Sequence, residues 1–344
     1  MAIIGSGFGM YCLLPSFSRN NNCEVKSICG RDSIRMQNYC KKFNTKRYDN
    51  WKEMLEKENP DAVAIATIPK FQYEIAKYAL ENNIAVFAEK PLTISKKSSK
   101  ELFELSKEKN MPNMVDYIFP EIIEWEKVKN ILEDHKIGEI FSIEVDWKFL
   151  SYDLKNKIQS WKTDIHQGGG ALSFYFSHVF YYLEYFFGKI KNLECSFATN
   201  EFVDSDIKIK MKIFFENGII GNANMNIESK DEQKHILKIN GKLGTLILEN
   251  NKNDFVDNFQ IFLKNEKGVE KIKVENSNSP WEQNEDSRIK VVSPIIDRFI
   301  QWCNTGKPAK PDFEDGMRIQ ELIDMARKSD ARFFEKFDKF SKIS

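Results

Sequence analysis

The stretch IIGSGFGM, residues 3–10, stands at the start of the chain and decides how its first third is interpreted. It follows the apolar run Ala2–Ile4, and the residues after it can form a helix over Phe8–Ser18. Glycines permit a tight bend and a close approach of backbone to ligand, and a helix N-terminus favours bound phosphate. The turn therefore predicts a site for the pyrophosphate of a dinucleotide, formed by Gly5, Ser6, Gly7, Phe8 and Gly9.

This glycine signal is incomplete. Gly5 and Gly7 fit the fingerprint G-x-G-x-x-G, but Met10 occupies its third glycine position and Gly9 lies one residue early. The alternative interpretation is a tight turn that binds no ligand. Its place between a strand and a helix at the start of the chain favours the cofactor site.

The next part of the chain alternates continuous apolar runs with helical patterns. Ala62–Ala66 and Ile84–Ala88 are apolar throughout, and Phe71–Asn82 repeats apolar residues at helical spacing. Strands of this kind belong to parallel sheets that helices cover on both faces. The pattern predicts an α/β fold, an N-terminal doubly wound Rossmann domain over residues 1–117.

The remainder of the chain has a different pattern. Apolar and polar residues alternate with a period of two in several runs, namely Ile140–Phe149, Leu193–Thr199, Ile207–Phe215, Ile219–Ile227 and Ile236–Glu249. Strands grouped in this way, with helices before and after them, predict a C-terminal α+β domain over residues 118–344 with a large, mostly antiparallel sheet. If one apolar face of that sheet is uncovered, a second copy would cover it, so we expect a homodimer or homotetramer.

Composition excludes several classes of function. Lys plus Arg and Asp plus Glu both number 51, so no global basic field favours nucleic acid or an anionic membrane. The six cysteines show no CxxC spacing, and the four histidines are not paired at metal-ligand spacing. A signal peptide begins with a positively charged segment followed by an apolar one, and the N-terminus has no such charged segment. We therefore expect a cytoplasmic protein with no metal, no nucleic-acid partner and no membrane segment.

The end of the second strand bears on the choice of coenzyme. An acidic residue there normally accepts the adenosine ribose hydroxyl of NAD, but this strand ends at Gly30, followed by Arg31. Glycine removes the carboxylate that would repel a 2′-phosphate, and a guanidinium can bind that phosphate with two hydrogen bonds. The sequence favours NADP(H), with NAD(H) possible. The alternative is that Arg31 is a solvated surface side chain and Asp32 binds the ribose.

Two further strand ends face the ligand side of the predicted sheet. One reads ATIPKFQ, residues 66–72, and the other FAEKPL, residues 87–92. Lys90 lies just beyond a buried strand, and Pro91 prevents that strand from continuing. A lysine beside a nicotinamide can donate a proton to the substrate oxygen and stabilise a developing alkoxide. The alternative is an exposed loop lysine, which is common in a lysine-rich chain.

These motifs together resemble one family. The segments GSGFG, DAVAIATIPKFQYEIAKYAL, AEKPLTIS, KIGEIFSIEVDWKF and SWKTDIHQGGGALSFYFSHVFYYLEYFFG, with INGKLGTLILE and a C-terminal GKPAKPDFEDGMRIQELIDMARKS, occur in the order found in the Gfo/Idh/MocA family. That family is named after glucose–fructose oxidoreductase, inositol dehydrogenase and a rhizopine-catabolism protein. The resemblance covers nearly the whole chain. It implies a Rossmann domain, a C-terminal sheet domain that often mediates oligomerisation, and NAD(P)-dependent oxidation or reduction of sugars, cyclitols and sugar derivatives.

The resemblance also implies roles for individual residues. Lys90 matches the lysine that contacts nicotinamide and substrate, and Glu89 precedes it in the same motif. The loop over the cofactor corresponds to Thr67, Ile68 and Pro69, and Gln72 stands where the family frequently has histidine. His178 matches the histidine of an Asp-x-x-x-His pair that transfers a proton at the substrate hydroxyl. Trp161 and Lys162 take the place of a Trp-Arg pair near the substrate.

One position departs from the family pattern. The aspartate of the Asp-x-x-x-His pair corresponds to Phe174, one helical turn before His178. A carboxylate there would orient the imidazole and raise its basicity, and phenylalanine does neither. If His178 is catalytic, it must be assisted by Tyr175, Asp164 or His166, or work with Lys90 alone. The alternative is that His178 is a core residue within an aromatic helix.

The first functional hypothesis is an NADP(H)-favouring dehydrogenase or reductase that uses Lys90 and His178. It would transfer hydride between nicotinamide and a hydroxyl or carbonyl of a sugar-like substrate, phosphorylated and nucleotide-linked sugars included. Substrate contacts are expected at Trp161, Asp164, His166 and Tyr175. A second hypothesis is a cofactor-binding regulator or scaffold without chemistry, which the replacement of aspartate by Phe174 supports. A third is a reductase acting on a carbonyl or imine outside carbohydrates.

Overall fold

The computed structural model describes residues 1–252, 254–274 and 285–330, and the rest of the predicted second domain lies outside these ranges. The chain divides into two compact units. Unit 1 comprises Met1–Glu121 and the described part of Ser279–Gln320, and unit 2 comprises the described parts of Ile122–Asn278 and Glu321–Ser344. The first change of unit lies near the predicted boundary at residue 117, whereas the return of the chain to unit 1 near its C-terminus was not anticipated.

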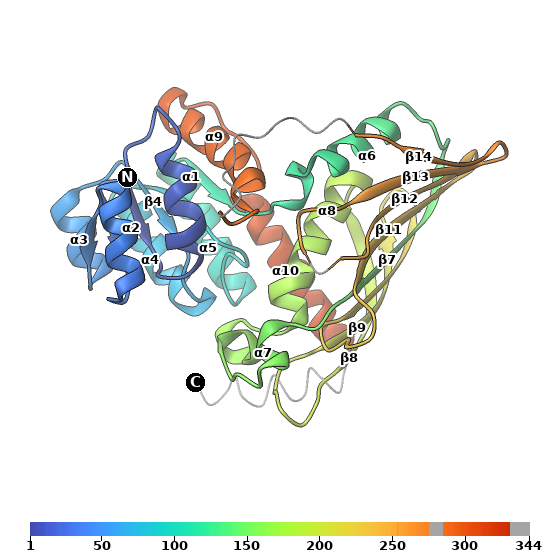
Figure 1. Ribbon diagram of the computed structural model, residues 1–344, viewed down its shortest axis with the longest axis horizontal. Helices are drawn as coiled ribbons and strands as arrows, with labels where there is room; N and C mark the ends of the chain where they lie inside the picture. The colour runs from blue at the N-terminus through green and yellow to red at the C-terminus, as the bar shows by residue number, and fades with distance from the viewer. Residues whose placement is uncertain (253, 275–284, 331–344) are drawn as a thin grey trace. The chain divides into compact units, whose positions relative to one another are not determined.

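Unit 1 is built on a six-stranded sheet with the order β3-β2-β1-β4-β5-β6 (Figure 1). Its strands are β1 (Ala2–Ile4), β2 (Ser27–Cys29), β3 (Lys46–Tyr48), β4 (Ala62–Ile65), β5 (Ala85–Ala88) and β6 (Asn113–Val115). Every neighbouring pair is parallel. The predicted Rossmann-type sheet is confirmed. The edge strand β3 was not foreseen, because its sequence KRY carries only one buried residue.

Helices cover both faces of this sheet, since all but one of its strands are buried along their whole length. On one side α1 packs against α2 and α9, and elsewhere α4 packs against α5, while Trp51 of α3 contacts Tyr78 of α4. The bounds are η1 (Gly9–Leu13, a π-helical turn), α1 (Leu14–Ser18), α2 (Ile34–Phe43), α3 (Trp51–Glu58), α4 (Pro69–Glu81), α5 (Lys96–Glu108), η2 (Phe119–Glu121) and α9 (Ile289–Thr305). The last helix, α10 (Phe313–Ser329), begins in unit 1 and continues into unit 2 after Gln320.

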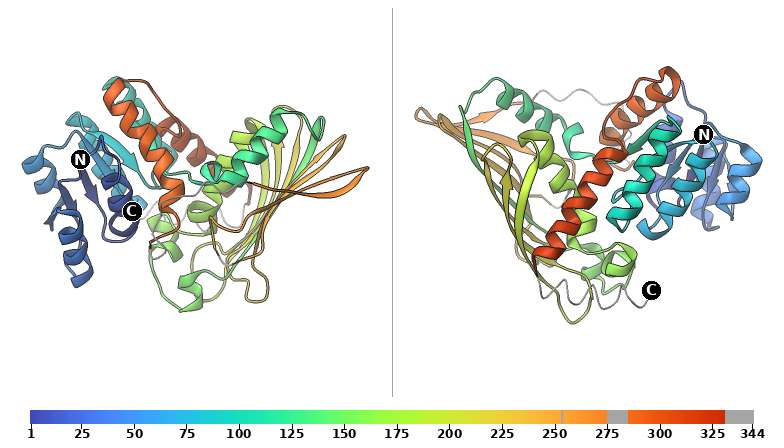
Figure 2. Two further views of the ribbon diagram at one scale, coloured as in Figure 1. Left: turned by 45° about the horizontal axis from the view of Figure 1, so that its top comes forward. Right: turned by 180° about the vertical axis from the view of Figure 1, so that it is seen from behind.

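Unit 2 contains an eight-stranded sheet with the order β14-β13-β12-β11-β7-β10-β9-β8 (Figure 2). Its strands are β7 (Ile140–Lys148), β8 (Ile190–Ala198), β9 (Lys208–Phe215), β10 (Ile220–Asn226), β11 (Lys234–Gly241), β12 (Gly244–Asn250), β13 (Gln260–Asn265) and β14 (Gly268–Ile272). Only β7 and β10 pair in parallel; the other neighbours are antiparallel. The predicted α+β domain with a mostly antiparallel sheet is confirmed.

Helices cover one face of the unit 2 sheet (Figures 1 and 2). They are α6 (Ile123–Glu133) and α8 (Ser177–Phe187), the latter continuing the π-helical η5 (Ala171–Phe176). The short helices α7 (Tyr152–Lys155), η3 (Trp161–Thr163) and η4 (Ile165–Gln167) lie between β7 and η5 in the chain. Strand residues alternate between buried and more exposed, because one face packs on these helices.

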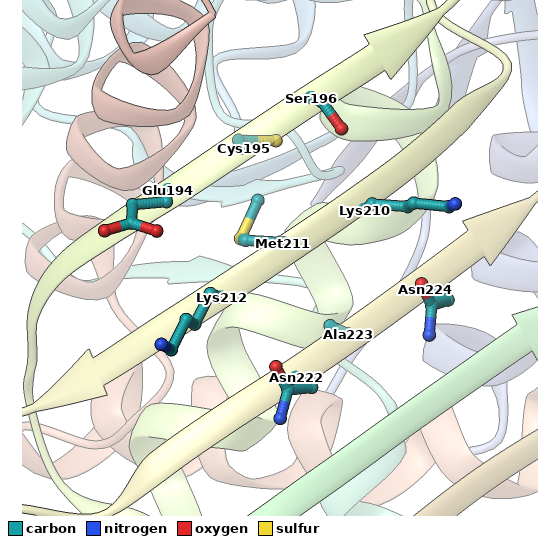
Figure 3. Close-up of a pocket in the computed structure, with 9 residues that line it drawn as sticks. All are labelled: Glu194, Cys195, Ser196, Lys210, Met211, Lys212, Asn222, Ala223 and Asn224. Atoms are coloured by element: carbon teal, nitrogen blue, oxygen red, sulfur yellow. The ribbon is translucent and has the colours of Figure 1, made fainter.

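The other face of the sheet is lined mainly by polar side chains. Figure 3 shows part of it, where Lys210, Lys212, Asn222 and Asn224 stand on strands whose alternate residues are buried. Neighbouring strands add Glu144 and Lys238, which form an ion pair at 2.8 Å. We expected a homo-oligomer if the uncovered face of the sheet were apolar, and this face is instead mainly polar. The homo-oligomer stays a prediction.

Candidate functional site

The glycine-rich turn leaves the carboxyl end of β1 in a conformation that Gly5 makes possible. Gly5 has φ +141°, and a Cβ at this position would lie 2.3 Å from the carbonyl oxygen of Ala66. Its N–H donates to the carbonyl of Cys29 at 2.9 Å. A Cβ on Gly7, in contrast, would meet nothing within 4 Å. Gly5 thus serves the fold, and Gly7 leaves open backbone at the turn.

Gly9, which lies one residue before the third glycine position of the fingerprint, allows the helix to pack closely against the strands. A Cβ on Gly9 would lie 3.3 Å from the Cβ of Ala66 and 3.3 Å from Cγ2 of Ile3. Close packing of helix on strand is the role that the dinucleotide fingerprint gives to its third glycine. Gly9 therefore fills this role, although Met10 stands at the expected position.

The end of β2 lies against the glycine-rich turn. A Cβ on Gly30 would be 3.0 Å from the Cβ of Ser6, so a larger residue would push into the turn. Arg31 and Asp32 follow and are exposed, and Ser33 caps α2 by accepting from the Met36 N–H at 3.1 Å. The structure thus places Arg31 next to the turn and before the N-terminus of α2.

A second arginine, Arg47 of β3, was missed by the sequence analysis. Its guanidinium donates to the Gly30 carbonyl at 3.1 Å and to Asp49 at 2.5 Å, and it lies 3.6 Å from Asp32. The Gln37 side chain donates a hydrogen bond to Asp32 at 3.1 Å. Asp32, the alternative ribose ligand, is therefore held by two neighbouring side chains. No sequence signal marked Arg47, because it lies on the edge strand that the pattern did not predict.

The loops after β4 and β5 are joined through Gln72. Pro69 begins α4, with Thr67 and Ile68 just before it. The Gln72 side chain is 1% exposed, and its amide nitrogen donates to the carbonyls of Glu89, Pro91 and Leu92 at 2.5, 3.1 and 3.0 Å. Gln72 therefore holds the segment that carries Lys90, and its burial leaves little surface for direct contact with a cofactor.

Lys90 follows β5, and the strands β1, β4 and β5 end side by side. The Ala66 N–H donates to the Ile4 carbonyl at 2.8 Å, and the Glu89 N–H donates to the Ile65 carbonyl at 2.9 Å. The turn, the Thr67–Pro69 loop and Lys90 thus share one edge of the sheet. This is the edge at which doubly wound sheets bind ligands.

Charged side chains gather beneath this edge. Asp116, which follows β6, is buried and lies next to Glu89, because β5 and β6 are parallel with Ala88 opposite Val115. Burial, followed by the charge of Glu89, holds the pKa of Asp116 well above its usual range. Arg288 lies 4.8 Å from the ring centroid of Phe8 and donates to Asp286 at 2.7 Å. The sequence analysis missed Asp116 and Arg288, because neither residue belongs to a recognisable motif in the sequence.

In unit 2 the predicted substrate residues surround a glycine-rich turn. Asp164 accepts from the His166 N–H at 2.8 Å and from the Gln167 side chain at 2.6 Å, so its carboxylate organises η4. Gly169 packs against the backbone of Trp161, whose carbonyl oxygen a Cβ there would meet at 2.2 Å. His166 is exposed. Trp161, Asp164 and His166 are thus brought together, with Asp164 in a structural role.

Phe174 is the centre of an aromatic cluster in the same unit. The Trp161 ring lies edge-on to it with centroids 5.1 Å apart, and the Lys162 ammonium lies 5.0 Å from its ring centroid. The Tyr175 ring also lies close to it, with centroids 4.6 Å apart, and burial raises the pKa of the Tyr175 hydroxyl. His178 is buried at the start of α8, one turn later. Phe174 therefore supports Trp161 and Lys162 instead of orienting His178.

Asp206 fixes the start of this helical segment and was also missed. It is buried, its Oδ2 accepts from the Leu172 N–H at 2.6 Å, and a Cβ on Gly170 would lie 2.4 Å from its Oδ1. Arg327 lies near it and donates to the Ser173 hydroxyl at 2.7 Å. Only the folded chain brings these residues together, since they lie far apart in sequence.

Two family models match the chain. A model described as an oxidoreductase family with an NAD-binding Rossmann fold matches residues 1–117. The model of the C-terminal alpha/beta domain of the same oxidoreductase family matches residues 129–332. The chain belongs to the Gfo/Idh/MocA family. The resemblance inferred from the motifs and the assignment to an oxidoreductase family are confirmed.

A relative in sequence agrees with the assignment to the Gfo/Idh/MocA family, and two solved structures share the fold. An uncharacterized oxidoreductase of Synechocystis sp. is 27% identical over 345 residues, which cover 96% of this chain and 93% of that protein. Levoglucosan dehydrogenase in complex with NADH has a TM-score of 0.82 at 20% identity, covering 96% of both chains. A 3-ketoreductase from Actinomadura kijaniata in complex with NADP and TDP-benzene has a TM-score of 0.81 at 18% identity, covering 95% of this chain and 96% of that one. These structural likenesses show the fold.

Two further findings concern membranes and metals. None of the helices in the described ranges combines the length and the hydrophobicity that crossing a membrane requires. Within the same part of the Gfo/Idh/MocA chain, His, Cys, Asp and Glu side chains do not gather in groups of three or more that could hold a metal ion.

Proposed function

We propose that this Gfo/Idh/MocA protein is a dehydrogenase or reductase that uses NADP(H) in preference to NAD(H) and acts on a hydroxyl or carbonyl of a sugar, cyclitol or sugar derivative. The observation that carries the proposal is the shared sheet edge, where Gly5–Gly9, Thr67–Pro69 and Lys90 follow β1, β4 and β5. The family assignment and the names of the relatives support a carbohydrate substrate.

The residues present fit a pyridine dinucleotide. Gly7 has no atom within 4 Å of its missing Cβ, so backbone there is open to a pyrophosphate, and the π-helical turn η1 begins two residues later. Ser6, Phe8 and Gly9 complete this turn. Arg31 would bind the 2′-phosphate, and Thr67–Pro69 and Glu89–Lys90 would line the nicotinamide end. When bound, the coenzyme supplies or accepts the hydride.

The side chains of the protein handle the proton and the substrate. Lys90 donates a proton to the substrate oxygen during reduction and stabilises negative charge on that oxygen. His178 is the second candidate for proton transfer, and Trp161, Asp164, His166 and Tyr175 are candidates for substrate contacts. Gln72 holds the backbone of the Lys90 segment through three carbonyls.

Two experiments, one on coenzyme binding and one on turnover, test the proposal. The first titrates the protein with NADPH and NADH and follows binding by coenzyme fluorescence; firm binding with NADPH tighter than NADH is expected. The second screens polyols, aldoses, ketoses, anhydrosugars and nucleotide-linked keto sugars for turnover. Lys90→Met should lower kcat about 100-fold or more and leave the coenzyme Kd nearly unchanged. Lys97→Met, an exposed lysine of α5, is the matched control. Equal turnover by Lys90→Met and wild type contradicts the role of Lys90.

A second candidate function is a coenzyme-binding regulator that performs no chemistry. Phe174 favours it, because the carboxylate that would orient His178 is replaced by a ring that packs against Trp161. Firm coenzyme binding with no turnover of any carbohydrate in the screen would support this function over the first.

A further inference from the structure

Arg47 reaches the end of the neighbouring strand from the edge of the unit 1 sheet. Strands β2 and β3 are parallel with Ile28 opposite Arg47, and the Gly30 N–H donates to the Tyr48 carbonyl at 3.1 Å. In the other direction, Nη1 of Arg47 donates to the Gly30 carbonyl at 3.1 Å. The guanidinium is therefore held at the residue that follows β2.

The end of the second strand is where doubly wound folds of this kind bind the adenosine ribose. A Cβ on Gly30 would lie 3.0 Å from the Cβ of Ser6, so this strand end adjoins the glycine-rich turn proposed for the pyrophosphate. Arg31 and Asp32 follow Gly30 and are exposed. A coenzyme whose pyrophosphate occupies the turn would thus bring its ribose close to Arg31, Asp32 and the Arg47 guanidinium.

Two carboxylates at this place act against a bound 2′-phosphate. Asp49 accepts from Nη1 and Nη2 of Arg47 at 2.5 and 3.0 Å, and Asp32 lies 3.6 Å from Nε of the same guanidinium. Without Arg47, these carboxylates would be opposed by the exposed arginines Arg31 and Arg35, whose charges solvent screens. Arg47 is the cation that the structure holds beside both carboxylates, so it decides whether a phosphate is repelled.

The ion pair with Asp49 is of a kind that a phosphate can replace. The Asp49 side chain is 77% exposed, and ion pairs open to solvent are weak. A phosphate offers a guanidinium two parallel hydrogen bonds, as Asp49 does, with a larger negative charge. Since Nη1 carries two N–H groups, its bond to the Gly30 carbonyl can persist when the phosphate replaces Asp49.

We propose that Arg47 is a specificity-determining residue that binds the 2′-phosphate of NADP(H) together with Arg31, and that Asp49 competes with this phosphate for Arg47. The proposal rests on the proposed function, in which the glycine-rich turn binds a pyridine dinucleotide. It assigns the coenzyme preference to an arginine of the edge strand, opposed by a carboxylate two residues later. Loss of Asp49 should therefore improve the binding of NADP(H).

Calorimetric titration with NADPH and NADH tests the role of Arg47, and circular dichroism verifies that each variant is folded. Arg47→Met should raise the Kd for NADPH about 10-fold and leave the Kd for NADH nearly unchanged, because only NADPH carries the 2′-phosphate. Arg47→Lys keeps the charge without the planar fork, so it should restore part of the affinity for NADPH. An equal loss of affinity for both coenzymes in Arg47→Met would show a structural role and contradict the proposal.

The role of Asp49 is tested by a variant that gains affinity. Asp49→Asn keeps the shape of the side chain and removes its charge, so the Kd for NADPH should fall about 3-fold or more while that for NADH stays the same. Glu108→Gln is the matched control, because Glu108 is exposed at the end of α5, which joins β5 to β6 at the opposite edge of the sheet from β3. This control removes the same charge and should change neither constant.

The outcomes separate this proposal from the proposed function. If wild type binds both coenzymes and neither Arg47→Met nor Asp49→Asn changes the ratio of their dissociation constants, Arg47 does not determine specificity, and the proposed dehydrogenase is unaffected. If wild type binds neither coenzyme, the coenzyme site itself is refuted, and the role of Arg47 is refuted with it. Opposite shifts of the NADPH constant in the two variants, with a constant value for NADH, support the proposal.

Discussion

At the scale of single residues, the proposed chemistry depends on side chains that other side chains hold in place. Lys90 follows a buried strand, and Gln72 donates to backbone carbonyls on both sides of it, while the Asp116 N–H donates to the Ala88 carbonyl at the end of that strand. Such support matters because a catalytic group works only within a narrow range of positions relative to the reacting atoms. Substitutions of the supporting residues should therefore change turnover more than they change coenzyme binding.

The first residue-scale prediction concerns Arg31. Arg31→Ala should raise the Kd for NADPH about 10-fold or more, since a guanidinium–phosphate contact is worth roughly 1.5–3 kcal/mol, and leave the Kd for NADH nearly unchanged. Lys41→Ala, an exposed cation further along α2, should change neither value. Equal NADPH affinities of Arg31→Ala and wild type would favour the alternative, in which Asp32 binds the ribose. Calorimetric titration measures both constants.

The second residue-scale prediction concerns Gln72. Gln72→Met removes donors from three carbonyl acceptors and should lower the free energy of unfolding by about 1–3 kcal/mol. Turnover should fall as well, because the Lys90 segment loses its support. Gln72→His keeps a ring donor at this position and should restore part of both properties. Urea denaturation gives the stabilities, and wild-type stability of Gln72→Met would contradict the assigned role.

At the scale of elements, the glycines of the strand–turn–helix unit have two roles: two of them allow close packing within the fold, and we propose that one leaves space for the ligand. Gly5 and Gly9 pack against Ala66, whereas the position of Gly7 is open. The sequence predicted the turn and the parallel sheet correctly, because continuous apolar strands between helices have few other arrangements. It did not predict edge strand β3, whose polar residues resemble a loop.

The element-scale prediction compares two glycine-to-alanine variants of this turn. Gly5→Ala should destabilise unit 1 by several kcal/mol or prevent folding, because its Cβ would lie 2.3 Å from the Ala66 carbonyl oxygen. Gly7→Ala should fold with nearly wild-type stability and bind coenzyme at least about 10-fold more weakly, because its methyl group would occupy the space for pyrophosphate. Thermal denaturation and coenzyme titration separate the two effects. Undiminished coenzyme affinity in Gly7→Ala would contradict the proposed binding turn.

At the scale of the whole molecule, each unit has its own core. The core of unit 2 includes His235, which stacks on Trp147 at 4.2 Å between centroids and lies 3.2 Å from the Tyr182 hydroxyl. Burial lowers the pKa of His235 to about 3, so the imidazole is neutral in the folded protein at physiological pH. Acid should therefore act on unit 2 through this buried ring.

The whole-molecule prediction follows from the sign of that shift. Between about pH 3 and pH 6.5, His235 binds a proton in the unfolded state but not in the folded state. Its contribution to the free energy of unfolding is therefore fully present above about pH 6.5 and decreases as the pH falls. Lowering the pH to 5 should cost about 2 kcal/mol through this residue. His235→Phe should reduce this acid sensitivity, and His135→Asn, at an exposed histidine, should not. Urea denaturation at both pH values measures the difference, and identical pH dependence of His235→Phe and wild type would contradict it.

The sequence by itself determined the family, the two folds and the residues that lie next to each other along the chain. Periodicity and glycine placement depend on local contacts, so GSGFG, the AEKP segment and the alternating strands were visible without a structure. Only the tertiary structure decided which distant residues meet. Asp116 lies next to Glu89 because β6 pairs with β5, Gln72 binds the Lys90 segment across two loops, and Asp206 accepts a hydrogen bond at the start of the helical segment before α8. These contacts depend on strand order and register, which no single stretch of sequence contains.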